Sequence, residues 1–389
     1  AAEQGDARAQ ASLGEMYKDG HGVTQDHKQA VYWFEKAAEQ GDARAQASLG
    51  EMYKDGHGVT QDLKQAVYWY EKAAEQGYAR GQVSLGSMYA RGRGVTQDDK
   101  QAVYWYKNAT EQGDDGGQAS LGEMAEQGNL PAQIYLGIFY EFGRGVTQDD
   151  KQAVYWFEKA AEQGDVYSQG SLGDMYSNGR GVTQDDKQAV YWYEKSAEQG
   201  DASAQANLGI MYRLGRGVTQ DDKQAVYWFE KAAEQGDARG QASLGEMYKD
   251  GRGVAQDNKQ GVYWFEQAAE QGDARGQTYL GILYEFGRGV ARDDKQAVGW
   301  YEKAAEQGYA YAQTTLGERY RYGRGVAQDL KKALYWFEKA AEQGDARGQY
   351  GLGRSYEDGH GVTQDHKQAV YWYEKAAEQG YTSAQHNLF

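Results

Sequence analysis

Apolar and polar positions follow one another along the chain in blocks that repeat every 36 residues. In the first half of a block, apolar residues recur at i, i+4 and i+8, as at Ala45, Leu49 and Tyr53, which is the stripe of an amphipathic helix. Asp42 precedes this stripe as a plausible N-cap and Gly56 follows it. The pattern therefore predicts a first helix, helix A, between these two residues.

The second half of each block carries another helical stripe. Ala30, Trp33 and Ala37 recur at i, i+3 and i+7, after Asp26 as an N-cap candidate and before Gly41 as a stop. We expect a second helix, helix B, so that each block forms a helical hairpin. An internal period of this length indicates stacked repeats, which bury a continuous core along the stack.

Two features fix the register of the repeats. The turn Gly-x-Gly-Val occurs ten times, and its first glycines are Gly20, Gly56, Gly92, Gly143, Gly179, Gly215, Gly251, Gly287, Gly323 and Gly359. All ten tryptophans occupy one position, which indicates a core residue repeated along the stack: Trp33, Trp69, Trp105, Trp156, Trp192, Trp228, Trp264, Trp300, Trp336 and Trp372. Glycine also recurs inside helix A, as at Gly50, and we expect a neighbouring indole to fill the space beside it.

One interval breaks the period. Gly92 and Gly143 are 51 residues apart instead of 72, so 21 residues of the pattern are missing. The pattern predicts a truncated repeat near 109–123 that lacks its turn and its tryptophan-bearing helix. We therefore divide the chain into regular repeats over 1–108, a truncated segment over 109–128 and regular repeats over 129–389, as one continuous solenoid with a local break in geometry.

These residues carry a family resemblance. The run Ala45-Gln46-x-x-Leu49-Gly50-x-x-Tyr53-x-x-Gly56-x-Gly58-Val59, followed by Asp62, Ala66, Trp69, Ala73-Ala74 and Gly77, resembles the Sel1-like repeat, a relative of the tetratricopeptide repeat. The resemblance implies an all-α, right-handed solenoid of about ten to twelve helix-turn-helix units, with A helices on the concave face. It also implies a partner-binding role and, in a bacterium, a periplasmic, secreted or cell-surface location.

Composition narrows the possible chemistry. The net charge of −16 disfavours nucleic acid, and no apolar run is long enough to insert into a membrane. Cysteine is absent, the six histidines match no metal-ligand spacing, and the Gly-Arg-Gly turns lack the lysine and hydroxyl residue of a phosphate-binding loop. We expect no enzyme, no catalytic residue, no metal and no cofactor.

Candidate binding residues lie on helix A, opposite the core stripe, at the positions of Ser48, Glu51 and Asp55. This second stripe is polar in most copies and apolar in a few, at Tyr135, Ile138, Phe142, Ile210, Leu214, Tyr279, Ile282, Phe286 and Tyr322. Large apolar residues on an exposed face are typical of contact surfaces, so we expect them to hold a protein or an extended peptide. The alternative is that neighbouring A helices bury them.

Helix B carries a tyrosine next to the tryptophan in every copy except at Gly299. These form a possible assembly ladder: Tyr32, Tyr68, Tyr104, Tyr155, Tyr191, Tyr227, Tyr263, Tyr335 and Tyr371. A lateral assembly surface or a sugar-stacking strip is one interpretation, and packing within the stack is the other.

Three functions remain in order of preference. The first is a non-enzymatic scaffold that binds protein through the A helices. The second is a structural protein that assembles into filaments, end to end or laterally, because the units are nearly identical and neither end resembles a capping repeat. The third is the non-catalytic part of a longer enzyme or signalling protein.

Overall fold

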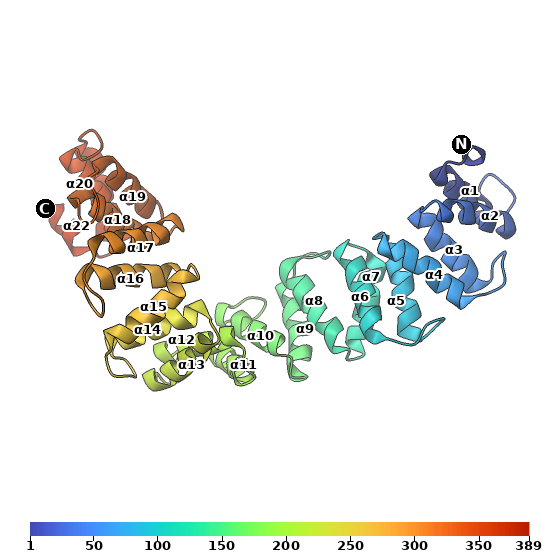
Figure 1. The fold of residues 1–389 in the computed structure, drawn as a ribbon, viewed down its shortest axis with the longest axis horizontal. Coiled ribbons are helices and arrows are strands. Elements are labelled where there is room, and N and C mark those ends of the chain that lie inside the picture. Colours follow the sequence, from blue (N-terminus) through green and yellow to red (C-terminus); the bar gives the residue numbers. More distant parts are fainter. Residues whose placement is uncertain (389) are drawn as a thin grey trace. The chain divides into compact units, whose positions relative to one another are not determined.

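The structure is a computed structural model that describes residues 1–388, and all its regular elements within this range are helices (Figure 1). After a 3-10 turn, η1 (Ala2–Gln4), the A helices are α1 (Ala7–Asp19), α3 (Ala43–Asp55), α5 (Ala79–Arg91), α7 (Asp115–Glu126), α8 (Leu130–Phe142), α10 (Val166–Asn178), α12 (Ala202–Leu214), α14 (Ala238–Asp250), α16 (Ala274–Phe286), α18 (Ala310–Tyr322), α20 (Ala346–Asp358) and α22 (Thr382–Asn387). The B helices are α2 (His27–Glu39), α4 (Leu63–Glu75), α6 (Asp99–Glu111), α9 (Asp150–Glu162), α11 (Asp186–Glu198), α13 (Asp222–Glu234), α15 (Asn258–Glu270), α17 (Asp294–Glu306), α19 (Leu330–Glu342) and α21 (His366–Glu378).

The helices gather into two compact units. Unit 1 spans Ala1–Asp185 and unit 2 begins at Asp186. Within each unit, every A helix that is followed by a B helix pairs with it, and each B helix also contacts the next A helix. This order is that of an α-solenoid built from helical hairpins, which confirms the predicted fold class.

The predicted helix ends are confirmed at the level of single hydrogen bonds. The Asp42 carboxylate accepts a hydrogen bond from the Ala45 amide at 2.8 Å, and Asp26 accepts from the Gln29 amide at 3.1 Å. Gly56 ends helix α3 in the left-handed region at φ 73°. Each end therefore satisfies amide or carbonyl groups that a helix leaves without an internal partner.

The glycine inside helix A marks the closest approach of the two helices in a hairpin. A Cβ atom built on Gly50 would lie 2.8 Å from the Tyr70 ring, and one on Gly14 would lie 2.6 Å from the Phe34 ring. The prediction that an indole fills this space was wrong. The ring belongs to the residue after the tryptophan, which is fully buried, whereas the adjacent indole points to another neighbour.

That neighbour is the preceding hairpin. Trp69 packs against the buried cluster of α1–α3, and Trp105 against the cluster of α4 and α5. Nine of the ten tryptophans are half-buried, and Trp156 is buried with 6% of its surface exposed. The predicted core tryptophans therefore lie at junctions between hairpins, while Phe34 and its equivalents fill the hairpins themselves.

The second glycine of each turn also fixes a junction. Gly58 has φ 74°, and a Cβ atom on it would collide with the carbonyl oxygen of His27, the first residue of the preceding B helix. Gly181 and Gly253 meet Asp150 and Asp222 in the same way. The turn of one hairpin thus lies directly on the backbone of the hairpin before it.

A chain of buried glutamines joins the same elements. The Gln46 side chain donates to the Ala38 carbonyl at 3.1 Å and accepts from Gln76 at 2.6 Å. Gln82 makes the same two bonds, to Ala74 and from Gln112. We call this arrangement the glutamine relay; it links the ends of two successive B helices through the A helix between them, and sequence reasoning missed it although every copy carries the glutamine.

At the break in the period, helix α7 has no following B helix to pair with. Helix α7 is followed by α8 after a short turn, with no B helix between them. Gly122, the counterpart of Gly50, would have nothing within 4 Å of a Cβ atom. The relay is also interrupted, because Gln118 donates to the Tyr140 hydroxyl at 3.1 Å instead of to a helix carbonyl.

Candidate partner-binding surface

The predicted stripe of helix A separates into two groups of residues. Tyr135, Ile138, Ile210, Tyr279 and Ile282 are half-buried. Tyr279 stacks on Phe265 with ring centroids 5.1 Å apart. Four of them, Tyr135, Ile210, Tyr279 and Ile282, pack against buried clusters of neighbouring helices.

Ile210 and Ile282 show the same behaviour in unit 2. Ile210 packs against the buried cluster of α13 and α14, and Ile282 packs against the cluster that includes Tyr301 and Leu316. In unit 1, Tyr135 lies 6.3 Å from the Phe139 ring of its own helix. All three side chains are therefore partly covered by neighbouring residues.

The other four predicted residues are more than half exposed. The exposed fractions are 54% for Phe142, 53% for Leu214, 58% for Phe286 and 51% for Tyr322. Each is the last residue of its A helix, directly before the glycine turn. Other copies place Asp55, Asp250 or Asp358 there, so the apolar residue is not required to form the hairpin.

An arginine of the turn lies over three of these four side chains. The guanidinium carbon of Arg144 lies 5.3 Å from the Phe142 ring centroid, and Arg288 and Arg324 lie 5.4 Å from the Phe286 and Tyr322 rings. The sequence places the cation two residues after the aromatic residue, across the left-handed glycine. Each site therefore offers a partner both an apolar surface and a positive charge.

Charged side chains connect neighbouring A helices of unit 2. Glu246 of α14 pairs with Arg213 of α12 at 3.3 Å and with Arg275 of α16 at 3.6 Å. Burial raises the pKa of the Glu246 carboxyl, and these two arginines and Lys249 oppose the shift. The carboxylate thus holds three A helices in register along the exposed face.

Arg321 of α18 is a buried cation that sequence reasoning missed. It donates to the Gly351 carbonyl at 2.8 Å and to the Ser355 hydroxyl at 2.6 Å, and it lies over the Phe337 ring. Burial lowers the pKa of its guanidinium, and the nearby charge of Arg354 lowers it further. Glycine at 351 makes room for the same Phe337 ring, since a Cβ atom there would lie 2.5 Å from it.

The predicted tyrosine ladder is exposed, with fractions between 40% and 50% for all nine tyrosines. Each ring packs edge-on against the tryptophan beside it, as for Tyr32 and Trp33 at 5.0 Å. A lysine four residues later approaches several of the rings, as Lys36 does Tyr32 at 5.0 Å. Much of each ring is therefore already in contact within its own helix.

Neither a metal centre nor a membrane span is found in residues 1–388. No group of three or more histidine or acidic side chains in this range could hold a metal ion. No helix there combines the length and the apolar character that crossing a bilayer requires.

The fold and the exposed surface define a class, the α-solenoids of stacked helical hairpins. Within that class the Sel1 repeat model matches ten segments, 7–42, 43–78, 79–114, 130–165, 166–201, 202–237, 238–273, 274–309, 310–345 and 346–381. The chain belongs to the Sel1 repeat family. Proteins of this family generally mediate protein–protein interactions and are generally non-catalytic scaffolds.

Solved structures of bacterial proteins agree with this assignment. A protective antigen of uropathogenic Escherichia coli with a Sel1-like fold is 43% identical, with a TM-score of 0.64 over 100% of this chain and 80% of that one. A Sel1 repeat protein from Oxalobacter formigenes is 35% identical, with a TM-score of 0.58 over 82% of this chain and 88% of that one. No curated protein matches the sequence.

Proposed function

We propose that the chain is a non-enzymatic scaffold that binds a protein segment along the A helices of unit 2. The observation that carries the proposal is the exposure of Leu214, Phe286 and Tyr322 at a position where other repeats have aspartate. A side chain that the fold does not need, and that exposes more than half of its apolar surface, is best explained by a partner that covers it. Phe142 gives unit 1 an equivalent site.

The chemistry of the surface describes the partner. Arg288 and Arg324 lie beside the apolar side chains and are themselves exposed, so they can pair with carboxylates. We therefore expect a segment that alternates apolar and acidic residues. Rigid helices hold the contact residues in place before binding, which limits the entropy lost on association.

The test replaces the apolar residues with the residue that nature uses at the same position. The triple variant L214D, F286D, Y322D should keep its stability to within about 0.5 kcal/mol per site, because these side chains lie on the surface. Its affinity for a partner captured from the producing cells should fall at least about tenfold, or about 1.4 kcal/mol. The measurement is calorimetric titration with that partner.

A matched control separates the surface from the added charge. The variant Y191D, Y227D, Y263D adds the same charge to the same unit, on helix B, and should bind the partner like the unmodified chain. If this variant loses the partner while the first one keeps it, the A-helix surface is not the binding site.

Assembly through the tyrosine ladder has weaker support, because the rings already pack on tryptophans of their own helices. A sedimentation coefficient that increases with protein concentration, and that falls back in the ladder variant, would favour assembly instead. For location, we propose the periplasm, the cell surface or the medium of a bacterium. The protective antigen among its relatives supports that choice.

A further inference from the structure

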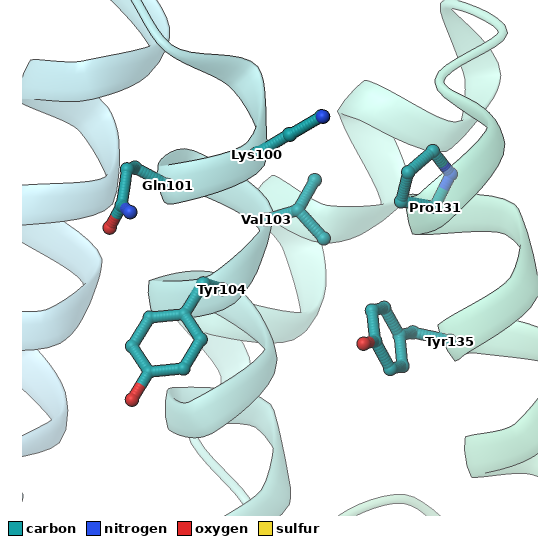
Figure 2. Close-up of a pocket in the computed structure, with 6 residues that line it drawn as sticks. All are labelled: Lys100, Gln101, Val103, Tyr104, Pro131 and Tyr135. Atoms are coloured by element: carbon teal, nitrogen blue, oxygen red, sulfur yellow. The ribbon is translucent and has the colours of Figure 1, made fainter.

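The break in the repeat pattern leaves a pocket between α6 and α8 in unit 1. It has a volume of about 430 Å³ and is lined by Lys100, Gln101, Val103, Tyr104, Pro131 and Tyr135. Figure 2 shows Lys100 and Val103 extending from α6 toward Pro131 and Tyr135 of α8. Most of the lining surface is apolar, with the lysine at the rim.

The pocket has a structural cause in the missing residues. In regular repeats the next glycine turn covers the first residue of the preceding B helix, as Gly58 covers His27 and Gly94 covers Leu63. Behind α6 the next turn is that of Gly145, which meets Thr110 near the far end of the helix. The first turns of α6 are therefore left without the element that covers them in the other hairpins.

An ion pair that is found at three complete junctions is also missing at this place. There the turn arginine pairs with the first residue of the preceding B helix, as Arg180 does with Asp150 at 3.0 Å. The corresponding Arg144 lies over Phe142, as Arg288 and Arg324 lie over their own aromatic neighbours, and no ion pair forms at Asp99 within residues 1–388. The pocket thus lies where a whole turn and its helix are absent.

We propose that this pocket binds an aromatic side chain of a partner polypeptide, next to a carboxylate of the same segment. The size of the pocket suits one large side chain, and Val103 and Pro131 provide an apolar wall. The Tyr135 ring, which extends from α8 toward α6 in Figure 2, offers a surface on which an aromatic residue packs favourably, and Tyr104 also lines the pocket. This site lies in unit 1 and is independent of the surface proposed above for unit 2.

The positive charge at the pocket favours a carboxylate next to the aromatic side chain of the partner. Lys100 lines the opening, while Lys107, whose ammonium lies 5.2 Å from the centroid of the Tyr135 ring, already pairs with Glu111 at 3.5 Å. Two acidic residues stand at the start of α6: Asp98 is engaged in capping, since it accepts hydrogen bonds from the Lys100 and Gln101 amides, and Asp99 directly precedes Lys100. An anionic neighbour to the aromatic group can therefore pair with Lys100, whereas a cationic one is repelled by it.

The experiment uses three probes with the full chain, measured by saturation-transfer NMR titration. Acetyl-Trp-Asp-amide should bind with a Kd on the order of 1 mM, as expected for a small isolated ligand. Acetyl-Trp-Asn-amide, which lacks only the charge, should bind at least fivefold more weakly. Acetyl-Ala-Asp-amide, which lacks the ring, should not bind measurably.

Variants assign the binding to this pocket. K100M should remove the preference for the aspartate probe, and P131Y should abolish binding by filling the space, since Tyr167 and Tyr311 occupy the same helix position in other repeats. K64M, at the equivalent position of the covered helix α4, should change nothing. Failure of the unmodified chain to bind the tryptophan probes, or equal binding by P131Y, would overturn the proposal.

Discussion

The substitution Gly58→Ala should lower the free energy of unfolding by about 3–4 kcal/mol, the largest single effect that the structure predicts. Alanine in the left-handed region costs about 1–2 kcal/mol in itself. In addition, its Cβ atom would collide with the His27 carbonyl, which belongs to helix backbone and cannot move without shifting α2. The free energy is measured by urea unfolding followed by circular dichroism.

Gly22→Ala provides a control with the same backbone conformation. Both glycines have φ 74° and both are the second glycine of their turns, but a Cβ atom on Gly22 meets only the flexible end of Met16, at 3.3 Å. This variant should lose only about 1–2 kcal/mol, the cost of the left-handed alanine. Equal losses of unfolding free energy in the two variants would mean that the turn does not pack against the backbone of the preceding hairpin.

The second large effect concerns the glutamine relay. Gln46→Met keeps the shape of the side chain but removes both of its hydrogen bonds, one to the Ala38 carbonyl and one from Gln76. Because Gln46 is buried, we expect a loss of about 2–3 kcal/mol, the cost of leaving buried polar groups without partners. Urea unfolding under the same conditions measures it.

The interrupted relay supplies the matched control. Gln118 occupies the same helix position, is half-buried, and donates only to the Tyr140 hydroxyl. Gln118→Met should therefore cost about 0.5–1 kcal/mol, the net value of one hydrogen bond. A loss as large as that of Gln46→Met would show that the relay itself adds nothing to stability.

The helices and their ends could be predicted from the sequence because their signals are local. Aspartate before each stripe, the spacing of apolar residues and glycine at each end act within one helix, and the structure shows the expected bonds at Asp42, Asp26 and Gly56. Because the pattern repeats, an assignment that is correct for one repeat also holds for the other copies. Ten matching segments of one repeat family follow from the same regularity.

Packing between helices was harder to predict. The sequence places Trp33 and Phe34 side by side on one helix, and the larger side chain was assigned to the space beside glycine. The structure gives that space to Phe34, whose ring lies against the Gly14 backbone, and the equivalent indole of the next B helix, Trp69, packs against the buried cluster of α1–α3. Which of two adjacent aromatic residues faces a given neighbour depends on the angle between the helices, and no local pattern encodes it.

The candidate site was predicted in part. The sequence identified the apolar residues on helix A, but only the structure separates Tyr279, packed on Phe265, from Phe286, which is exposed. The pocket at the break was not foreseen, although the missing residues were. Its position follows from the displacement of the Gly145 turn along α6, a three-dimensional consequence of the deletion.

The central claim is that α7 is the first helix of a repeat whose second helix is missing. Restoring the missing residues tests this claim. A copy of residues 53–73 inserted between Met124 and Ala125 returns the interval between Gly92 and Gly143 to the regular period. The account predicts a chain with a higher urea midpoint than the unmodified one, because Gly122 regains an aromatic ring and α6 regains its covering turn. An unchanged or lower midpoint would contradict it.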